Sequence, residues 1–174
     1  MQSTFVITFI SDDRPGLVEA LSQVISTHGG NWLESRLSQL SGKFAGLISV
    51  SLPSEAADAL REALIGLSEA GIHVSVTPCS GQAATEDHGR ILRLTVLGPD
   101  RPGIVREIAA ALSKRDINVV DLETYVSPAP MSSELMFHAT VEAAVPNPDN
   151  LGELETTLDQ IADEMHVDIT LEGP

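Results

Sequence analysis

The tetrapeptide Asp-Arg-Pro-Gly occurs twice in this chain, at residues 13–16 and again at residues 100–103. We call these segments corner 1 and corner 2. Each follows a run of apolar residues and precedes apolar residues with helical spacing. Aligned without gaps over residues 5–40 and 92–127, the two copies are identical at eight of 36 positions, and ten further positions exchange one apolar residue for another. A matched tetrapeptide with matched periodicity on both sides indicates a duplicated unit.

The first copy has a hydrophobic pattern that predicts the element order β-α-β-β-α-β. The nearly continuous apolar run before corner 1 is typical of a buried strand. Leu17, Leu21 and Ile25 then fall on one helical stripe, which Gly29 and Gly30 end. The predicted strands cover residues 4–10, 31–40, 44–52 and 72–77, and the second helix follows Pro53, with Leu60, Leu64 and Leu67 along one face.

The second copy repeats this order. Its strands are predicted at residues 90–97, 118–126, 135–143 and 167–171, and its helices from the stripes Ile104–Ile108–Leu112 and Leu151–Leu154–Leu158–Ile161–Met165. The polar, Gly-containing stretch 80–89 is predicted to be a linker. It separates a first domain of residues 1–79 from a second domain of residues 90–174.

The predicted fold class is α+β, with two tandem ferredoxin-like units. A β-α-β-β-α-β unit forms a four-stranded antiparallel sheet with both helices on one face. The other face, or a sheet edge, is left free. Two units can complete each other by pairing edges or faces, within one chain or in a homo-oligomer.

The charge of the chain argues against direct binding to nucleic acid. Ten basic and 25 acidic side chains give a net charge of −15, and residues 116–174 hold 13 acidic residues with no Lys or Arg. Nucleic-acid binding requires Lys and Arg to neutralise phosphates. Aromatic residues make up only 3% of the chain, so platforms for stacking bases are also not expected.

The expected location is the cytoplasm, as a soluble protein without a membrane span. A single cysteine, Cys79, excludes an internal disulfide and fits a reducing compartment. The N-terminal segment lacks the basic region and the long apolar run of a signal peptide.

Catalysis is not expected, and neither a cofactor nor a metal is implied. The five histidines show no metal-ligand spacing, and no nucleophile-elbow, phosphate-loop or dinucleotide glycine pattern is present. His28 is interpreted as a helix-end residue that interacts with terminal carbonyl groups.

Both corners admit a structural interpretation. Proline is favoured in the first helical turn, an Asp before a helix can cap it, and a Gly after Pro allows close backbone approach. On this interpretation the repeated corner records only that each unit starts a helix in the same way.

The corners also admit a ligand-binding interpretation. A helix N-terminus offers free N–H groups to a carboxylate, and Asp13 or Asp100 can accept hydrogen bonds from an ammonium group. Asn31 and Asn118 begin the next strand, which is expected to lie beside the corner. Gly16 and Gly103 are expected to leave room that a Cβ would fill. Together these groups suit an α-amino acid.

A β-α-β-β-α-β unit with an apolar strand, Asp-Arg-Pro-Gly and an aliphatic helix ending before an Asn resembles the ACT domain family. Both copies fit, and they cover nearly the whole chain. The resemblance implies small regulatory modules that bind amino acids at interfaces between paired units. It carries the ligand-binding role onto Asp13, Gly16 and Asn31 in the first copy and Asp100, Gly103 and Asn118 in the second.

The copies are not interchangeable. Asp12 precedes corner 1 where Pro99 precedes corner 2, and Gly29-Gly30 before the first Asn becomes Asp116-Ile117 before the second. These differences leave open whether one copy or both can bind a ligand.

The function implied by the resemblance is amino-acid sensing, with glycine favoured. The signal passes to a protein partner such as a DNA-binding regulator. Two alternatives from the sequence remain: an interaction module that needs no ligand, and a regulatory subunit of an amino-acid-metabolising enzyme.

Overall fold

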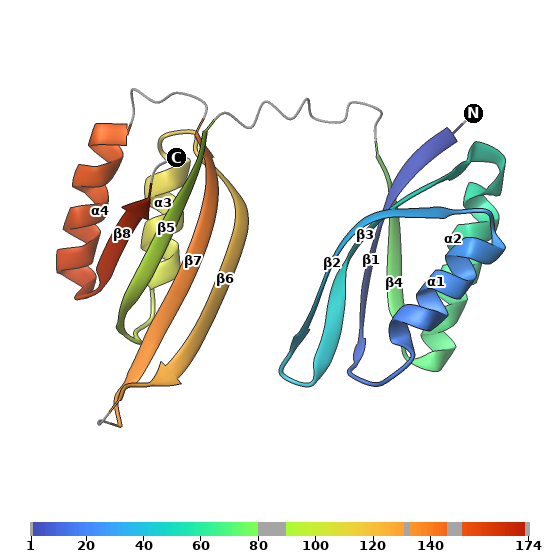
Figure 1. The fold of residues 1–174 in the computed structure, drawn as a ribbon, viewed down its shortest axis with the longest axis horizontal. Coiled ribbons are helices and arrows are strands. Elements are labelled where there is room, and N and C mark those ends of the chain that lie inside the picture. Colours follow the sequence, from blue (N-terminus) through green and yellow to red (C-terminus); the bar gives the residue numbers. More distant parts are fainter. Residues whose placement is uncertain (1, 80–89, 131–132, 146–150, 173–174) are drawn as a thin grey trace. The chain divides into compact units, whose positions relative to one another are not determined.

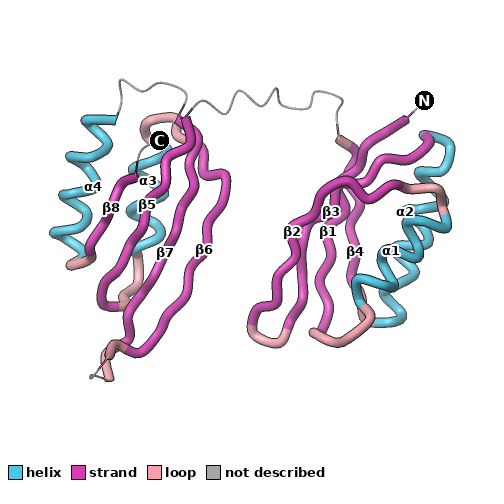
Figure 2. The backbone as a smooth tube through the Cα atoms, viewed as in Figure 1, coloured by secondary structure: helices cyan, strands magenta, loops and turns pink. Residues whose placement is uncertain are grey.

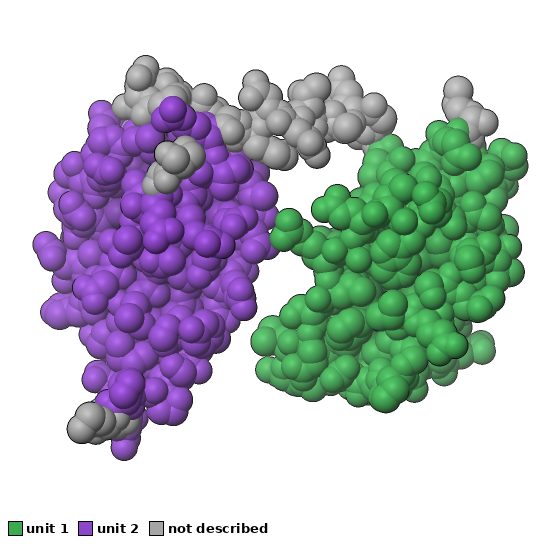
Figure 3. All heavy atoms as spheres, viewed as in Figure 1, with its two compact units in different colours: residues 1–84 green, residues 85–174 purple. Residues whose placement is uncertain are grey.

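The computed structural model describes residues 2–79, 90–130, 133–145 and 151–172. The chain divides into two compact units, Met1–Ala84 and Thr85–Pro174, called unit 1 and unit 2 (Figure 3). The predicted linker, residues 80–89, lies outside the described residues, so the domain limits at residues 79 and 90 stay predictions.

Each unit has the predicted α+β architecture, which confirms the fold class (Figure 1). In unit 1 the sheet order is β2-β3-β1-β4, and every neighbouring pair is antiparallel. The elements of unit 1 are β1 (Gln2–Asp12), α1 (Leu17–Thr27), β2 (Asn31–Leu40), β3 (Lys43–Pro53), η1 (Ser54–Ala56), α2 (Ala57–Gly66), η2 (Leu67–Ala70) and β4 (His73–Pro78).

Unit 2 repeats the same order, β6-β7-β5-β8, again with antiparallel neighbours. Within each unit the helices cover one face of the sheet (Figure 2). The elements of unit 2 are β5 (Arg90–Pro99), α3 (Ile104–Ser113), β6 (Asn118–Pro128), β7 (Leu135–Val145), α4 (Leu151–Met165) and β8 (Asp168–Glu172).

The predicted helical stripes form the cores. In unit 1 the α1 stripe of Leu17, Leu21 and Ile25 is buried against the sheet. Alternate β3 residues Ile48 and Val50 meet it from the sheet side. Phe9 is the one aromatic side chain among the buried residues of this core, and the others are aliphatic. Aliphatic side chains can stabilise such a core, because burial of apolar area contributes about 25 cal/mol per Å².

Unit 2 has its own core, built from the equivalent positions. Ile104, Ile108 and Leu112 of α3 are buried with Leu154 and Leu158 of α4. Among the residues that the structure describes, no helix is long and apolar enough to cross a membrane.

Candidate functional site

Each corner is a turn that ends at a glycine in the left-handed region. Gly16 (φ 90°) is the N-cap of α1, and Gly103 (φ 104°) is the N-cap of α3. Only glycine adopts this backbone conformation without strain. A Cβ on Gly16 would meet no atom within 4 Å, so backbone conformation, not close packing, requires the glycine there.

The structural interpretation of the corner is therefore wrong in two respects. No side chain caps α1 or α3, so Asp13 and Asp100 are not helix caps. Pro15 and Pro102 come before the N-cap glycine rather than inside the first helical turn. The glycine takes the N-cap position because the chain must reverse direction between strand and helix.

The aspartates are held through their backbone, which leaves the carboxylates exposed. The Asp13 N–H donates to the carbonyl oxygen of Gly42 at 2.9 Å, in the β2–β3 turn. The Asp100 N–H donates to the carbonyl oxygen of Leu135 at 2.8 Å, at the start of β7. Each corner thus combines an exposed carboxylate with a helix N-terminus that no side chain caps.

The expected adjacency of Asp and Asn within one unit is wrong. Asn31 lies opposite Ser51 on β3, and Ser51 lies opposite Thr4 on β1. Asn31 is therefore level with the start of β1, whereas Asp13 follows its end. Both β1 and β2 are antiparallel to β3, so β2 starts at the end of the sheet where β1 starts.

The second unit separates its pair in the same way. Asn118 lies opposite Ala144, near the end of β7, and Ala144 lies opposite Ile91 at the start of β5. Asp100 follows the far end of β5. Each unit thus has its corner and its Asn end, the start of β2 or β6, at opposite ends of its sheet.

Corner 1 lies next to one ion pair and borders an open hollow. Asp12 forms an ion pair with Lys43, which lowers the pKa of that carboxyl through a hydrogen bond and charge attraction. The Arg14 guanidinium donates to the carbonyl oxygen of Ala70, at the end of η2. The hollow is lined by the corner residues and by Leu17, Val18, Glu19 and Phe44.

Corner 2 carries less negative charge than corner 1. Arg106 stands where unit 1 has Glu19, and it forms an ion pair with Glu107, with 2.6 Å between Arg106 Nη2 and Glu107 Oε1. Pro99 replaces the acidic Asp12. A carboxylate is therefore less repelled at corner 2 than at corner 1.

The Asn end of unit 2 also forms a hollow, which sequence reasoning did not find. Ser113, Asp116 and Asn118 supply polar groups there, beside Ala109, Ile117 and Val119. Asp116 has φ 54° and ends the helix in the place of Gly29, which has φ 74°. The signal in the sequence was the exchange of Gly29 for Asp116, because a helix end with a positive φ favours glycine. A polar residue at such a position marks this end of unit 2 for inspection.

His28, the helix-end candidate of the sequence, has a structural role. The His28 Nδ1–H donates to the carbonyl oxygen of Val24 at 2.8 Å, which confirms that His28 is a helix-end residue. Within the described ranges, no group of three or more His, Cys, Asp or Glu side chains could hold a metal ion.

A comparison with models of protein families finds a match in each of the two units. The family model for the ACT domain matches residues 3–77 and 90–172. The chain belongs to the ACT domain family. The two matches coincide with units 1 and 2, so the protein is a tandem of two ACT domains.

Two solved structures match the chain over its full length. A protein from Galdieria sulphuraria, described as an unknown protein, is 32% identical, with a TM-score of 0.84, and the match covers 100% of this chain and 99% of that one. A protein provisionally named a glycine cleavage system transcriptional repressor is 20% identical, with a TM-score of 0.74, and the match covers 100% of this chain and 98% of that one. At this identity the second likeness shows the tandem fold alone. A comparison with curated protein sequences finds no match.

Proposed function

We propose that this tandem ACT protein is an amino-acid-sensing transcriptional regulator that binds a small amino acid, with glycine favoured. The observation that carries the proposal is the build of the corners. Each presents an uncapped helix N-terminus next to an exposed Asp carboxylate. The first can hold a ligand carboxylate and the second a ligand ammonium group.

In this proposal a complete site forms where the corner of a unit in one copy of the chain meets the Asn end of a unit in a second copy. The support is the separation of Asp and Asn within each unit, since one unit alone cannot bring both to one ligand. Gly16 and Gly103 belong to the corner half-site, and Asn31 and Asn118 to the other half. Ligand binding then favours the association of copies that completes the site.

Corner 2 is the better seat for the ligand carboxylate, because Glu19 is replaced there by Arg106, which is paired with Glu107, and Asp12 is replaced by Pro99. Isothermal titration calorimetry of the full chain with glycine, alanine, serine and leucine tests this. Asp100→Ala should lower the affinity for the bound amino acid about tenfold, and Asp13→Ala should lower it less. If no amino acid gives heat or a thermal shift at millimolar concentration, the sensing role is excluded.

The Asn variants then show how the site is completed. Asn31→Ala and Asn118→Ala both change exposed residues, so each should leave the fold intact. We expect only the Asn that completes the site to match the effect of Asp100→Ala. If neither variant changes affinity, the ligand does not use an Asn end.

We further propose that the protein acts in the cytoplasm through a protein partner, a DNA-binding regulator, and that its role is regulatory rather than catalytic. The similarity to the protein provisionally named a glycine cleavage system transcriptional repressor supports a role in transcription. The acidic last third of the chain supports action through a partner, since it would repel DNA phosphates. In a mobility-shift assay at low salt, the chain alone should leave DNA unshifted. A shift by the chain alone would contradict the proposal.

A further inference from the structure

The C-terminal end of α3 in unit 2 carries an aspartate that the fold does not require. Asp116 has φ 54°, in the left-handed region that favours glycine. It also places a carboxylate at the negative end of the helix dipole, where an acidic side chain is unfavourable. Unit 1 has Gly29, with φ 74°, at the same position and avoids both costs. Residues that oppose local preferences in this way are typical of functional sites.

The carboxylate of Asp116 is not neutralised by the bases next to it. The Arg115 guanidinium turns toward α3 and α4, where it donates to the carbonyl oxygens of Ala111 at 3.1 Å and Glu153 at 3.0 Å. In the part of the chain that the structure describes, neither Lys114 nor Asp116 forms an ion pair. This end of unit 2 therefore keeps a negative charge that a cation from outside the unit can reach.

Asp116 lines the open hollow at the Asn end of unit 2, whose volume is about 430 Å³. The Ser113 hydroxyl and the Asn118 amide are the other polar side-chain groups of this hollow. Both supply an oxygen that accepts hydrogen bonds from an ammonium group, as the carboxylate does. The volume lies within the roughly 300–1,000 Å³ of sites for small molecules. The polar part of the hollow thus suits a cationic group of a small ligand.

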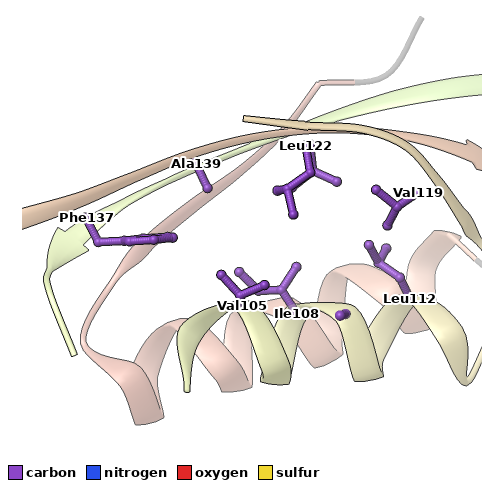
Figure 4. Close-up of a pocket in the computed structure, with 9 residues that line it drawn as sticks. Val105, Ile108, Leu112, Val119, Leu122, Phe137 and Ala139 are labelled. Atoms are coloured by element: carbon purple, nitrogen blue, oxygen red, sulfur yellow. The ribbon is translucent and has the colours of Figure 1, made fainter. Parts of the chain in front are cut away.

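The rest of this hollow is an apolar wall of Ala109, Ile117 and Val119. Ala109 and Val119 also line a second hollow, between α3 and the sheet, in which Val119 points toward Leu112 (Figure 4). The second hollow is lined only by apolar residues, and its volume of about 20 Å³ is too small for a ligand of its own. An aliphatic chain that ends in a cation matches the apolar wall with a carboxylate beside it.

The Asn end of unit 1 lacks this combination. Gly29 and Gly30 precede Asn31, and residues 26–32 hold no acidic side chain. Trp32 stands where unit 2 has Val119, and its ring packs against the unit 1 core. The two Asn ends therefore differ both in charge and in the side chain that follows the Asn.

We propose that a site completed by the Asn end of unit 2 selects an amino acid with a positively charged side chain, such as lysine. This inference rests on the proposed function, in which a corner holds the carboxylate and the α-ammonium group of the ligand. The Asn end of the second copy then faces the ligand side chain. The methylene groups of that side chain lie on the apolar wall, and its terminal ammonium group binds the carboxylate of Asp116. A site completed by the Asn end of unit 1 has no such carboxylate and suits glycine.

Isothermal titration calorimetry of the full chain with lysine, norleucine and glycine tests this inference. Norleucine is lysine without the terminal ammonium group, so lysine should bind at least about tenfold more tightly. Asp116→Asn keeps a side chain that tolerates a positive φ. It should lower the affinity for lysine about tenfold and change the affinities for norleucine and glycine less than about twofold.

Two control variants separate the carboxylate of Asp116 from stability and from general charge. Asp116→Gly restores the residue of unit 1, so it should lose the same affinity for lysine without a lower unfolding midpoint. Asp159→Asn removes the same charge from an exposed position of α4. It should change the affinity for lysine less than about twofold.

The outcomes distinguish this inference from the proposed function. If glycine or norleucine binds and lysine binds no more tightly than norleucine, the inference is overturned and the amino-acid site stands. Equal affinity for lysine in Asp116→Asn and the unaltered chain overturns it as well, and so does an equal loss in Asp116→Asn and Asp159→Asn. Binding of no amino acid at millimolar concentration removes the proposed function and this inference with it.

Discussion

Strands β2 and β6 hold equivalent places in the two units, but their surfaces differ. β2 exposes two large hydrophobic residues, Leu33 and Leu40, and carries Arg36 at the position of Glu123 in β6. In β6 the helix side carries Leu122, and the other face carries Asp121 and Glu123 together with Tyr125, whose ring stacks on His138. Duplication thus preserved the buried stripes that define the fold, whereas the residues of the two edge strands diverged.

The sheets of the two units also differ in their interiors, and a substitution there is expected to change the free energy of unfolding most. Gly46 on β3 lies where β2 approaches closely, so an added Cβ would overlap the Arg36 carbonyl oxygen and lie 2.6 Å from Leu37 Cδ2. Unit 2 has Ala139 at this position in the sheet. Gly46→Ala should lower the free energy of unfolding of unit 1 by about 3 kcal/mol, and Ala139→Gly should lower that of unit 2 by about 1 kcal/mol.

The two units can be followed separately in one denaturant titration. The chain has one Trp, Trp32 in unit 1, and one Tyr, Tyr125 in unit 2. Gly46→Ala should move the Trp32 fluorescence transition and leave the Tyr125 transition in place. Equal movement of both would mean that the units unfold together.

The second prediction compares the ends of the first helix in each unit. Arg115 occupies the position of His28, but it also bridges to α4, with Nη2 donating to Glu153 O at 3.0 Å and Thr157 Oγ1 at 2.6 Å. Arg115→Ala should destabilise unit 2 by about 2 kcal/mol, and His28→Ala should destabilise unit 1 by about 1 kcal/mol. Urea unfolding measures the loss of unfolding free energy in both variants. A smaller loss in Arg115→Ala than in His28→Ala would show that the contacts of Arg115 with α4 do not stabilise unit 2.

The third prediction concerns the corners, which are alike in backbone. Gly16→Ala and Gly103→Ala should each cost about 1 kcal/mol of unfolding free energy, because both glycines are left-handed. Asp13→Ala and Asp100→Ala should cost less than about 0.5 kcal/mol, since neither caps a helix. A loss of about 1 kcal/mol of unfolding free energy in either aspartate variant would indicate that this aspartate caps its helix.

The smallest effect is a pH dependence confined to corner 1. The Lys43 ammonium lowers the pKa of Asp12, and Pro99 removes the equivalent group from unit 2. A lowered folded-state pKa stabilises unit 1 above the ordinary Asp pKa. That stability is lost as the pH falls toward and through the lowered value. An NMR titration should show the pKa of Asp12 rising to its ordinary range in Lys43→Met. An unchanged pKa in that variant would exclude Lys43 as the cause.

The sequence by itself determined the duplicated β-α-β-β-α-β order, the buried helical stripes and the family. Period-2 and period-3.6 patterns report which face of each element is buried, and Leu17, Leu21 and Ile25 are buried as their spacing predicts. The need for glycine at positions 16 and 103 was also visible, although its physical reason was not.

Only the tertiary structure decided which residues meet. Asp13 and Asn31 are 18 residues apart, but strand direction, not sequence separation, sends Asn31 to the other end of the sheet. The apolar hollow between α3 and the sheet of unit 2 likewise brings together residues of α3, β6 and β7 that lie far apart in the sequence. Side-chain patterns encode burial locally, whereas the meeting of distant residues depends on sheet order and packing that no single segment specifies.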